Sequence, residues 1–176
     1  MKKIAFLIYL IFFYPNVMSG EPIEIYIIDP LDEDRGYCID IKGHKFQANI
    51  NKELQAHTCY SYRGAIAVDQ RFDSLKVKRN QFFLTEFDVC MEAVSLSESA
   101  LIQLKSCNFG RRQNFKWAIK GTIHPISDMK LCLTIDQGVS NKGNGGSPVH
   151  LKRNLTLELC NDRIAPYQIW GKRKVN

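Results

Sequence analysis

The chain has 176 residues, of which 45% are hydrophobic, 24% are charged and 11% are aromatic. This is enough apolar material for the core of one domain, and it excludes an intrinsically disordered chain. The formal net charge is +6, from 24 basic and 18 acidic side chains, and the basic ones are scattered without an aromatic ladder between them. We therefore expect no nucleic-acid partner, because proteins of that class gather their positive charge along one face.

The first segment has the pattern of a secretory signal peptide. A short basic start precedes an apolar run over residues 4–14, and a cleavage site follows at Ser19 or Gly20. The run is shorter than the roughly 20 apolar residues of a membrane-spanning helix, and no later run reaches that length, so we expect no membrane span. We expect residues 1–19 to be removed and the mature chain, residues 20–176, to be secreted or periplasmic.

The mature chain reads as a succession of short strands. Alternating segments rich in β-branched and aromatic side chains cover residues 23–28, 81–89, 130–135, 155–159 and 167–170. Glycine-containing turns lie between them. The segment 91–104 leaves an alternative open, since its apolar residues would also share one side of a helix. An all-β domain of about twelve short strands is the economical interpretation.

The cysteine count predicts disulfide bonds. An even number of cysteines in an exported chain favours bridges, whereas a zinc site would need close pairs such as Cys-x-x-Cys, so we expect no metal. Six cysteines allow fifteen pairings, and spacing alone leaves the pairing open. The six are Cys38, Cys59, Cys90, Cys107, Cys132 and Cys160.

The chain also repeats itself three times. Each unit contains an early cysteine followed by a polar residue two positions on, then a second cysteine, then Gln-x-aromatic or a related pattern. We align the last landmark as Asp69-Gln70-Arg71-Phe72, Asn114-Phe115-Lys116-Trp117 and Tyr167-Gln168-Ile169-Trp170. Three coincident landmarks indicate three structural repeats, which we expect at about 23–75, 76–120 and 121–176.

Cys-x-Asp, a second Cys and Gln-x-Trp, repeated three times over residues 23–171, resemble the ricin-type β-trefoil lectin domain. The resemblance implies a β-trefoil with one disulfide inside each repeat. The implied bridges are Cys38–Cys59, Cys90–Cys107 and Cys132–Cys160. It also implies that the Gln-x-Trp residues build the core around the pseudo-threefold axis, and these residues are Phe72, Trp117, Gln168 and Trp170.

The resemblance further implies a sugar site in the first repeat. Asp40 matches the acidic position, Gln55 and His57 match the polar and ring positions before the second cysteine, and Asp69 and Gln70 match the final pair, with Asp in place of Asn. Sugar recognition needs a flat ring for the C–H face and a carboxylate or amide for the hydroxyls. The competing interpretation is that Asp40 caps a turn and His57 is merely exposed.

The other two repeats depart from the family pattern. In the second, Glu92 replaces Asp and Lys105 replaces the ring, and in the third, Thr134 and Glu158 stand at those positions. The third repeat also carries a glycine-rich insertion, Val139 to Pro148. At most one conventional pocket is expected, and a single shallow pocket binds at about millimolar dissociation constants.

Two functions remain open. The chain lacks the nucleophile elbow, the zinc-protease motif and the phosphate loop that common enzymes carry, so we expect no enzyme activity and no cofactor. The first hypothesis is a carbohydrate-binding module for a glycan or glycoconjugate, for example one of galactose type. The second is a protein-interaction trefoil, such as the accessory or delivery subunit of a secreted toxin-like complex or an inhibitor, which would use the loop Gln137 to Pro148.

Overall fold

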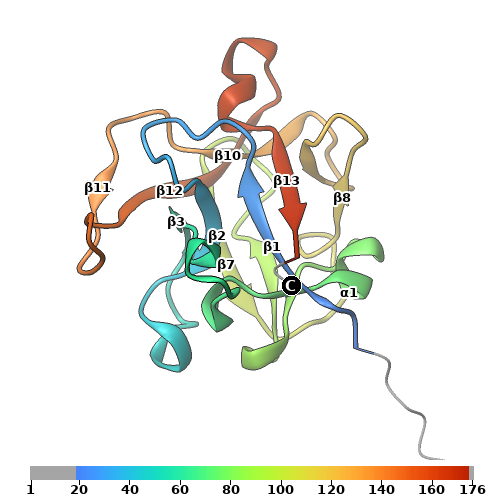
Figure 1. The fold of residues 1–176 in the computed structure, drawn as a ribbon. Coiled ribbons are helices and arrows are strands. Elements are labelled where there is room, and N and C mark those ends of the chain that lie inside the picture. Colours follow the sequence, from blue (N-terminus) through green and yellow to red (C-terminus); the bar gives the residue numbers. More distant parts are fainter. Residues whose placement is uncertain (1–18, 175–176) are drawn as a thin grey trace, which may run out of the picture.

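The computed structural model describes residues 19–174 (Figure 1). The expected signal peptide, apart from Ser19, lies outside this range. The described chain contains β1 (Pro22–Ile27), β2 (Tyr37–Ile41), β3 (Leu54–Thr58), β4 (Phe72–Asp73), β5 (Phe83–Leu84), β6 (Val89–Ala93), β7 (Ala100–Lys105), β8 (Phe115–Trp117), β9 (Ile123–Pro125), β10 (Leu131–Ile135), β11 (Asn141–Lys142), β12 (Leu151–Leu159) and β13 (Trp170–Arg173). Its helices are α1 (Ser74–Lys78) and the 3-10 turns η1 (Lys45–Gln47), η2 (Ser61–Arg63), η3 (Val68–Gln70), η4 (Thr85–Phe87) and η5 (Asp162–Tyr167).

Three equivalent antiparallel hairpins form the body of the fold: β2 with β3, β6 with β7, and β10 with β12. In each, the early cysteine lies opposite the residue two positions before the second cysteine, giving the pairs Cys38–His57, Cys90–Lys105 and Cys132–Glu158. One disulfide closes each hairpin: Cys38–Cys59, Cys90–Cys107 and Cys132–Cys160. The implied pairing is confirmed, and the helical alternative for residues 91–104 is wrong, because β6 and β7 occupy that segment.

The two ends of the described chain meet. β1 pairs with β13 in antiparallel register from Glu24–Arg173 to Ile27–Trp170, and the two arrows lie side by side in the centre of Figure 1. β1 therefore has a neighbour on each side, β13 and β2, and the first strand is not a free edge. No helix among residues 19–174 is long and apolar enough to cross a membrane.

The aromatic core differs from the prediction in the second repeat. Phe72, Phe115 and Trp170 are at most 2% exposed, and Phe82 packs edge-to-face against Phe72 and Phe115 at centroid distances of 6.3 and 6.0 Å. Trp117, the residue predicted for this core, is only partly buried and stacks on Phe82 at 6.1 Å. Phe115 therefore takes the position that we assigned to Trp117, because the second repeat has the shortest connection after its second cysteine.

Three buried glutamines show the correct alignment of the repeats. Gln70, Gln113 and Gln168 each accept the backbone N–H of the residue after the second cysteine, at 3.0, 2.8 and 3.0 Å. Each also donates its amide to the carbonyl of the residue before that cysteine, at 3.0 to 3.1 Å. A buried amide has to satisfy its donors and acceptor in this way. The motif of the second repeat is thus Gln113-Asn114-Phe115, two residues earlier than predicted.

Candidate functional site

The acidic side chain predicted to contact sugar lies at the centre of a buried hydrogen-bond cluster. Asp40 on β2 is 2% exposed, and it accepts Gln55 Nε2 at 2.7 Å on Oδ1 and Gln70 Nε2 at 3.0 Å on Oδ2. Burial, followed by the nearby Asp69 carboxyl group, raises the pKa of Asp40 well above its ordinary value. A sugar hydroxyl would reach Asp40 by replacing the amide of Gln55, because Gln70 is held on both sides by the backbone.

Asp69 offers an acceptor that has no partner. It belongs to η3, is 1% exposed, and accepts the backbone N–H of Lys45 at 2.7 Å on Oδ2. Its Oδ1 is buried without a hydrogen bond in the described structure, and burial raises the pKa of its carboxyl group. An unpaired buried acceptor is costly, and a hydroxyl donor would satisfy it.

His57 follows Gln55 on the same face of β3, but the face of its ring is not freely accessible. The ring is 7% exposed, with Tyr60 stacked at a centroid distance of 5.4 Å and His150 edge-on at 5.2 Å. Nδ1 lies 3.1 Å from the carbonyl oxygen of Thr58. Burial lowers the pKa of His57 to about 4, so the ring is neutral at neutral pH.

All five predicted residues therefore come together in the first repeat. Both parts of the competing interpretation are wrong: Asp40 binds two side-chain amides instead of capping a turn, and His57 is buried.

The glycine-rich insertion of the third repeat forms one wall of this site. At its start, Arg153 donates to the carbonyl oxygens of Asp136, at 2.9 Å, and Gly138. At its end, Arg35 donates to the carbonyl oxygens of Pro148 and Val149 at 2.9 and 3.0 Å. Between these anchors the loop contains β11 and returns to His150, whose ring lies edge-on to that of His57 at 5.2 Å. β11 lies in the orange segment at the left of Figure 1.

Both anchoring arginines are themselves held by carboxylates. Arg35 pairs with Glu33, whose Oε2 also accepts the hydroxyl of Thr58 at 2.6 Å. Arg153 pairs with Asp32 at 2.8 Å. Burial opposes the charge on Asp32, but hydrogen bonds from Ser140, Arg153 and Tyr37 lower its pKa to about 2. Pro148 lies 113 residues from Arg35 and Asp32 lies 121 residues from Arg153, so no local pattern in the sequence indicated these two contacts.

A cleft extends from the first repeat into the third. The register sets Gln55 opposite Asn154 and His57 opposite Lys152, and Asn141 pairs with Lys152 on the next strand. These side chains lie on one face of β3, β12 and β11, because successive positions on a strand alternate between faces. With the turn 42–52 they line a cavity of about 430 Å³, a size typical of small-molecule sites.

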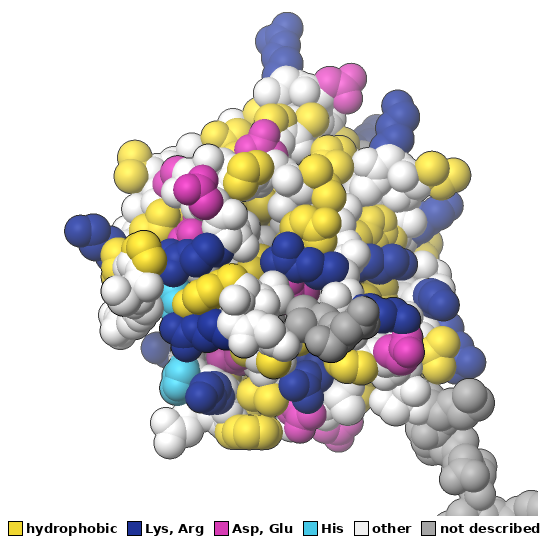
Figure 2. All heavy atoms as spheres, in the orientation of Figure 1, with side chains coloured by type: hydrophobic (Ala, Val, Ile, Leu, Met, Phe, Trp, Pro, Cys, Tyr) yellow, Lys and Arg dark blue, Asp and Glu magenta, His cyan; other side chains and the backbone are white. Residues whose placement is uncertain are grey.

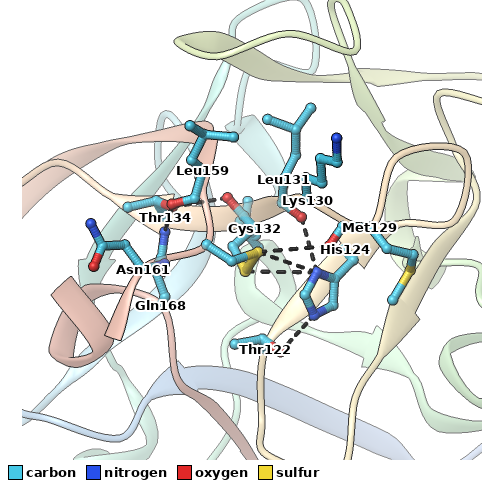
Figure 3. Close-up of a disulfide and its surroundings, with 12 residues drawn as sticks. Thr122, His124, Met129, Lys130, Leu131, Cys132, Thr134, Leu159, Asn161 and Gln168 are labelled. Atoms are coloured by element: carbon cyan, nitrogen blue, oxygen red, sulfur yellow. Dashed lines mark hydrogen bonds between the residues drawn. A yellow bond between two sulfur atoms is a disulfide. The ribbon is translucent and has the colours of Figure 1, made fainter. Parts of the chain in front are cut away.

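The equivalent positions of the other repeats hold no ring. Glu92 accepts Gln103 at 3.0 Å and Gln113 at 2.9 Å and pairs with Arg112 at 3.3 Å. Figure 3 shows the third repeat, in which Gln168 donates to Thr134 Oγ1 at 2.9 Å in front of the Cys132–Cys160 disulfide. The same framework thus surrounds a different polar residue in each repeat.

Comparisons with known proteins agree with this architecture. Residues 31–170 match the family described as ricin-type beta-trefoil lectin domain. No curated protein sequence shows significant similarity to the chain. A solved structure of the mdaA-1 domain has a TM-score of 0.63 at 13% identity and covers 89% of this chain and 91% of its own.

Two further solved structures contain sugar. The C-terminal domain of an earthworm lectin in complex with 6'-sialyllactose, a mutant form, has a TM-score of 0.58 at 15% identity, covering 88% of this chain and 98% of its own. The β-trefoil lectin of the Vibrio vulnificus hemolysin/cytolysin with N-acetyl-D-lactosamine bound has a TM-score of 0.53 at 12% identity, covering 90% and 96%. At these identities the likeness concerns the fold. With the family match over most of its length, this chain belongs to the ricin-type β-trefoil lectin family.

Proposed function

We propose that this chain is an exported, non-catalytic glycan-binding module that holds a sugar at its first repeat, through Asp40, Gln55, His57, Asp69 and Gln70. One observation carries the proposal. Among the three equivalent hairpins, only the first combines a carboxyl–amide pair with an aromatic ring, since His57 stands where the others have Lys105 and Glu158. The sugars in the similar earthworm and Vibrio lectins make a galactose-type glycan the first to test.

The roles follow from the chemistry of each group. The free Oδ1 of Asp69 accepts a sugar hydroxyl, and Gln55, at the rim of the cluster, turns to donate and accept. The neutral ring of His57 lies between Tyr60 and His150, and the part of it that lines the cleft contacts the apolar face of the sugar. One site of this kind gives about 4 kcal/mol, a millimolar affinity, so strong attachment requires several copies on one surface.

A glycan array probed with the oxidised protein, expressed from its full sequence, tests the proposal. We expect Gln55→Ala and His57→Ala each to weaken binding by about tenfold or more, because each leaves a polar group or a sugar face without its partner. The matched controls are Gln103→Ala and Lys105→Ala, which remove the equivalent side chains of the second repeat and should leave binding unchanged.

Equal losses in the control variants would contradict the assignment to the first repeat. If the folded protein binds no glycan at all, the lectin proposal fails. The protein-interaction hypothesis would then take its place, because the loop Gln137 to Pro148 presents Val139 at 90% exposure.

A further inference from the structure

The cleft between the first and third repeats is positively charged. Four of the side chains that line it are cationic: Lys42, Lys52, Lys152 and Arg153. The others that line it are His57, glycines and amides, and within residues 19–174 no carboxylate lines it. In Figure 2, histidine side chains at the left of the molecule lie next to Lys and Arg side chains.

Two of these cations are already neutralised. Lys42 pairs with Glu53 at 3.1 Å, and Arg153 pairs with Asp32 at 2.8 Å. Lys52 and Lys152 form no ion pair with any residue of the range 19–174. Lys152 is half-buried beside His57, and its charge adds to the burial that lowers the pKa of that ring. The charge of Lys52 also reaches Glu53 and contributes to the lowered pKa of that carboxylate, but the two groups form no ion pair. The cleft therefore retains two positive charges without an ion-pair partner among residues 19–174.

The neighbouring cleft, further along the same face of β12, has the opposite character. It is lined by Asp136 and Glu158 together with Thr134, Thr156 and Asn154, and no cation contributes to it. Asn154 borders both clefts. The positive charge thus belongs to the Lys152 end of the strand, and general surface basicity does not account for it.

Amides complete the chemistry of the positive cleft. Gln55, Asn141 and Asn154 share its sheet face, and each can both donate to and accept from hydroxyl groups. A ligand that satisfies this lining carries many hydroxyls and a negative charge. We propose that the glycan bound by this protein is anionic, and that its carboxylate or sulfate group lies between Lys52 and Lys152. This inference rests on the proposed function and names the class of its ligand.

The test compares matched pairs of glycans on the same array. Each pair consists of a neutral oligosaccharide and the same oligosaccharide bearing a sialic acid or a sulfate ester, so that the two arms separate carboxylate from sulfate. For the pair that binds best, titration calorimetry gives the two affinities. We expect the anionic member to bind about tenfold more tightly at low ionic strength, since each exposed ion pair contributes a few-fold. This advantage should shrink as salt screens the charges.

A double variant, Lys52→Gln with Lys152→Gln, should bring the ratio of the two affinities close to one. The matched control, Lys105→Gln with Lys116→Gln, removes the same charge from exposed side chains of the second repeat and should leave the ratio unchanged. Thermal unfolding of both variants verifies that they fold.

Each remaining outcome overturns the inference in a distinguishable way. Equal binding of neutral and anionic partners would reject it and leave the proposed function intact. An anionic preference that survives the Lys52 and Lys152 changes would place the charge recognition elsewhere. Equally strong, lysine-dependent binding of a single-stranded oligonucleotide would show a general polyanion site. Failure to bind any glycan would remove the proposed function and this inference together.

Discussion

Among the single residues, Asp40 belongs both to the hydrogen-bond framework of the first repeat and to the proposed binding site. Its two oxygens hold the amides of Gln55 and Gln70, and Gln70 in turn fixes the backbone on both sides of Cys59. Replacing this carboxyl group therefore affects the framework as well as any ligand contact. For this reason the variants chosen above alter residues at the rim of the cluster.

The raised pKa of Asp40 makes a prediction about stability and pH. The folded protein holds this proton more tightly than the unfolded chain, in which the pKa is about 3.9. The free energy of unfolding should therefore fall as pH rises from about 4 through the raised pKa. Asp40→Asn removes this effect, so its stability relative to the wild type should increase with pH. Urea unfolding of both proteins between pH 4 and pH 7 measures the difference, and a constant difference would contradict a buried, titrating carboxyl group.

Among the structural elements around the candidate site, the glycine-rich loop determines the shape of the site. Arg153 and Arg35 hold its two ends, and its interior is held by the backbone bonds from Gly143 N–H to the His150 carbonyl and from His150 N–H to the Gly145 carbonyl, at 2.6 and 2.8 Å. The insertion is therefore held in place at both ends and in its interior, and it forms one wall of the cleft between the first and third repeats.

Gly146→Ala tests this wall. Gly146 has a φ of +91°, and a Cβ there would lie 2.3 Å from the buried ring of His150, so alanine strains the backbone by about 1–2 kcal/mol and displaces the ring. We expect faster hydrogen exchange at the amides of Gly143 and His150, measured by NMR. Gly145→Ala is the matched control, because its Cβ would meet open space. Equal exchange in the two variants would mean that the loop is not held through His150.

In the molecule as a whole, each repeat has its own disulfide bond, whereas the hydrophobic core is built from all three repeats and the candidate site from two of them. The three disulfides span 21, 17 and 28 residues, all within single repeats. The cleft, in contrast, combines β3 of the first repeat with β11 and β12 of the third. Damage to the second repeat should therefore affect stability more than binding.

Replacing both cysteines of one disulfide by alanine, one disulfide at a time, separates the effect on stability from the effect on binding. Loss of either Cys90–Cys107 or Cys38–Cys59 should lower the free energy of unfolding by about 2–4 kcal/mol, measured with urea. Only the loss of Cys38–Cys59 should also weaken glycan binding, because Cys38 pairs with His57 and Cys59 lies between the two backbone partners of Gln70. Equal weakening by both pairs would contradict a site confined to the first and third repeats.

The three repeats, the disulfide pairing implied by the family resemblance, and the members of the first-repeat cluster could all be predicted from the amino-acid sequence. These features depend on short segments, in which a cysteine and its neighbours keep their spacing within one hairpin. Trp117 is not the core aromatic residue of the second repeat. The glutamine of the motif is Gln113, so the aromatic residue two positions later is Phe115. Loop length between repeats varies, so only the hydrogen bonds of the glutamine could locate the motif.

Three features could be seen only in the folded molecule: the residues of the candidate site are buried, the loop of the third repeat borders the first repeat, and Lys52 and Lys152 line one cleft. The burial of Asp40 comes from Gln55 and Gln70, which lie 15 and 30 residues away in the chain. The other two features depend on contacts between segments about a hundred residues apart, such as His57 with Lys152 and Arg35 with Pro148. Local sequence patterns do not predict contacts between such distant segments. These segments meet only when all three repeats have packed around the common core.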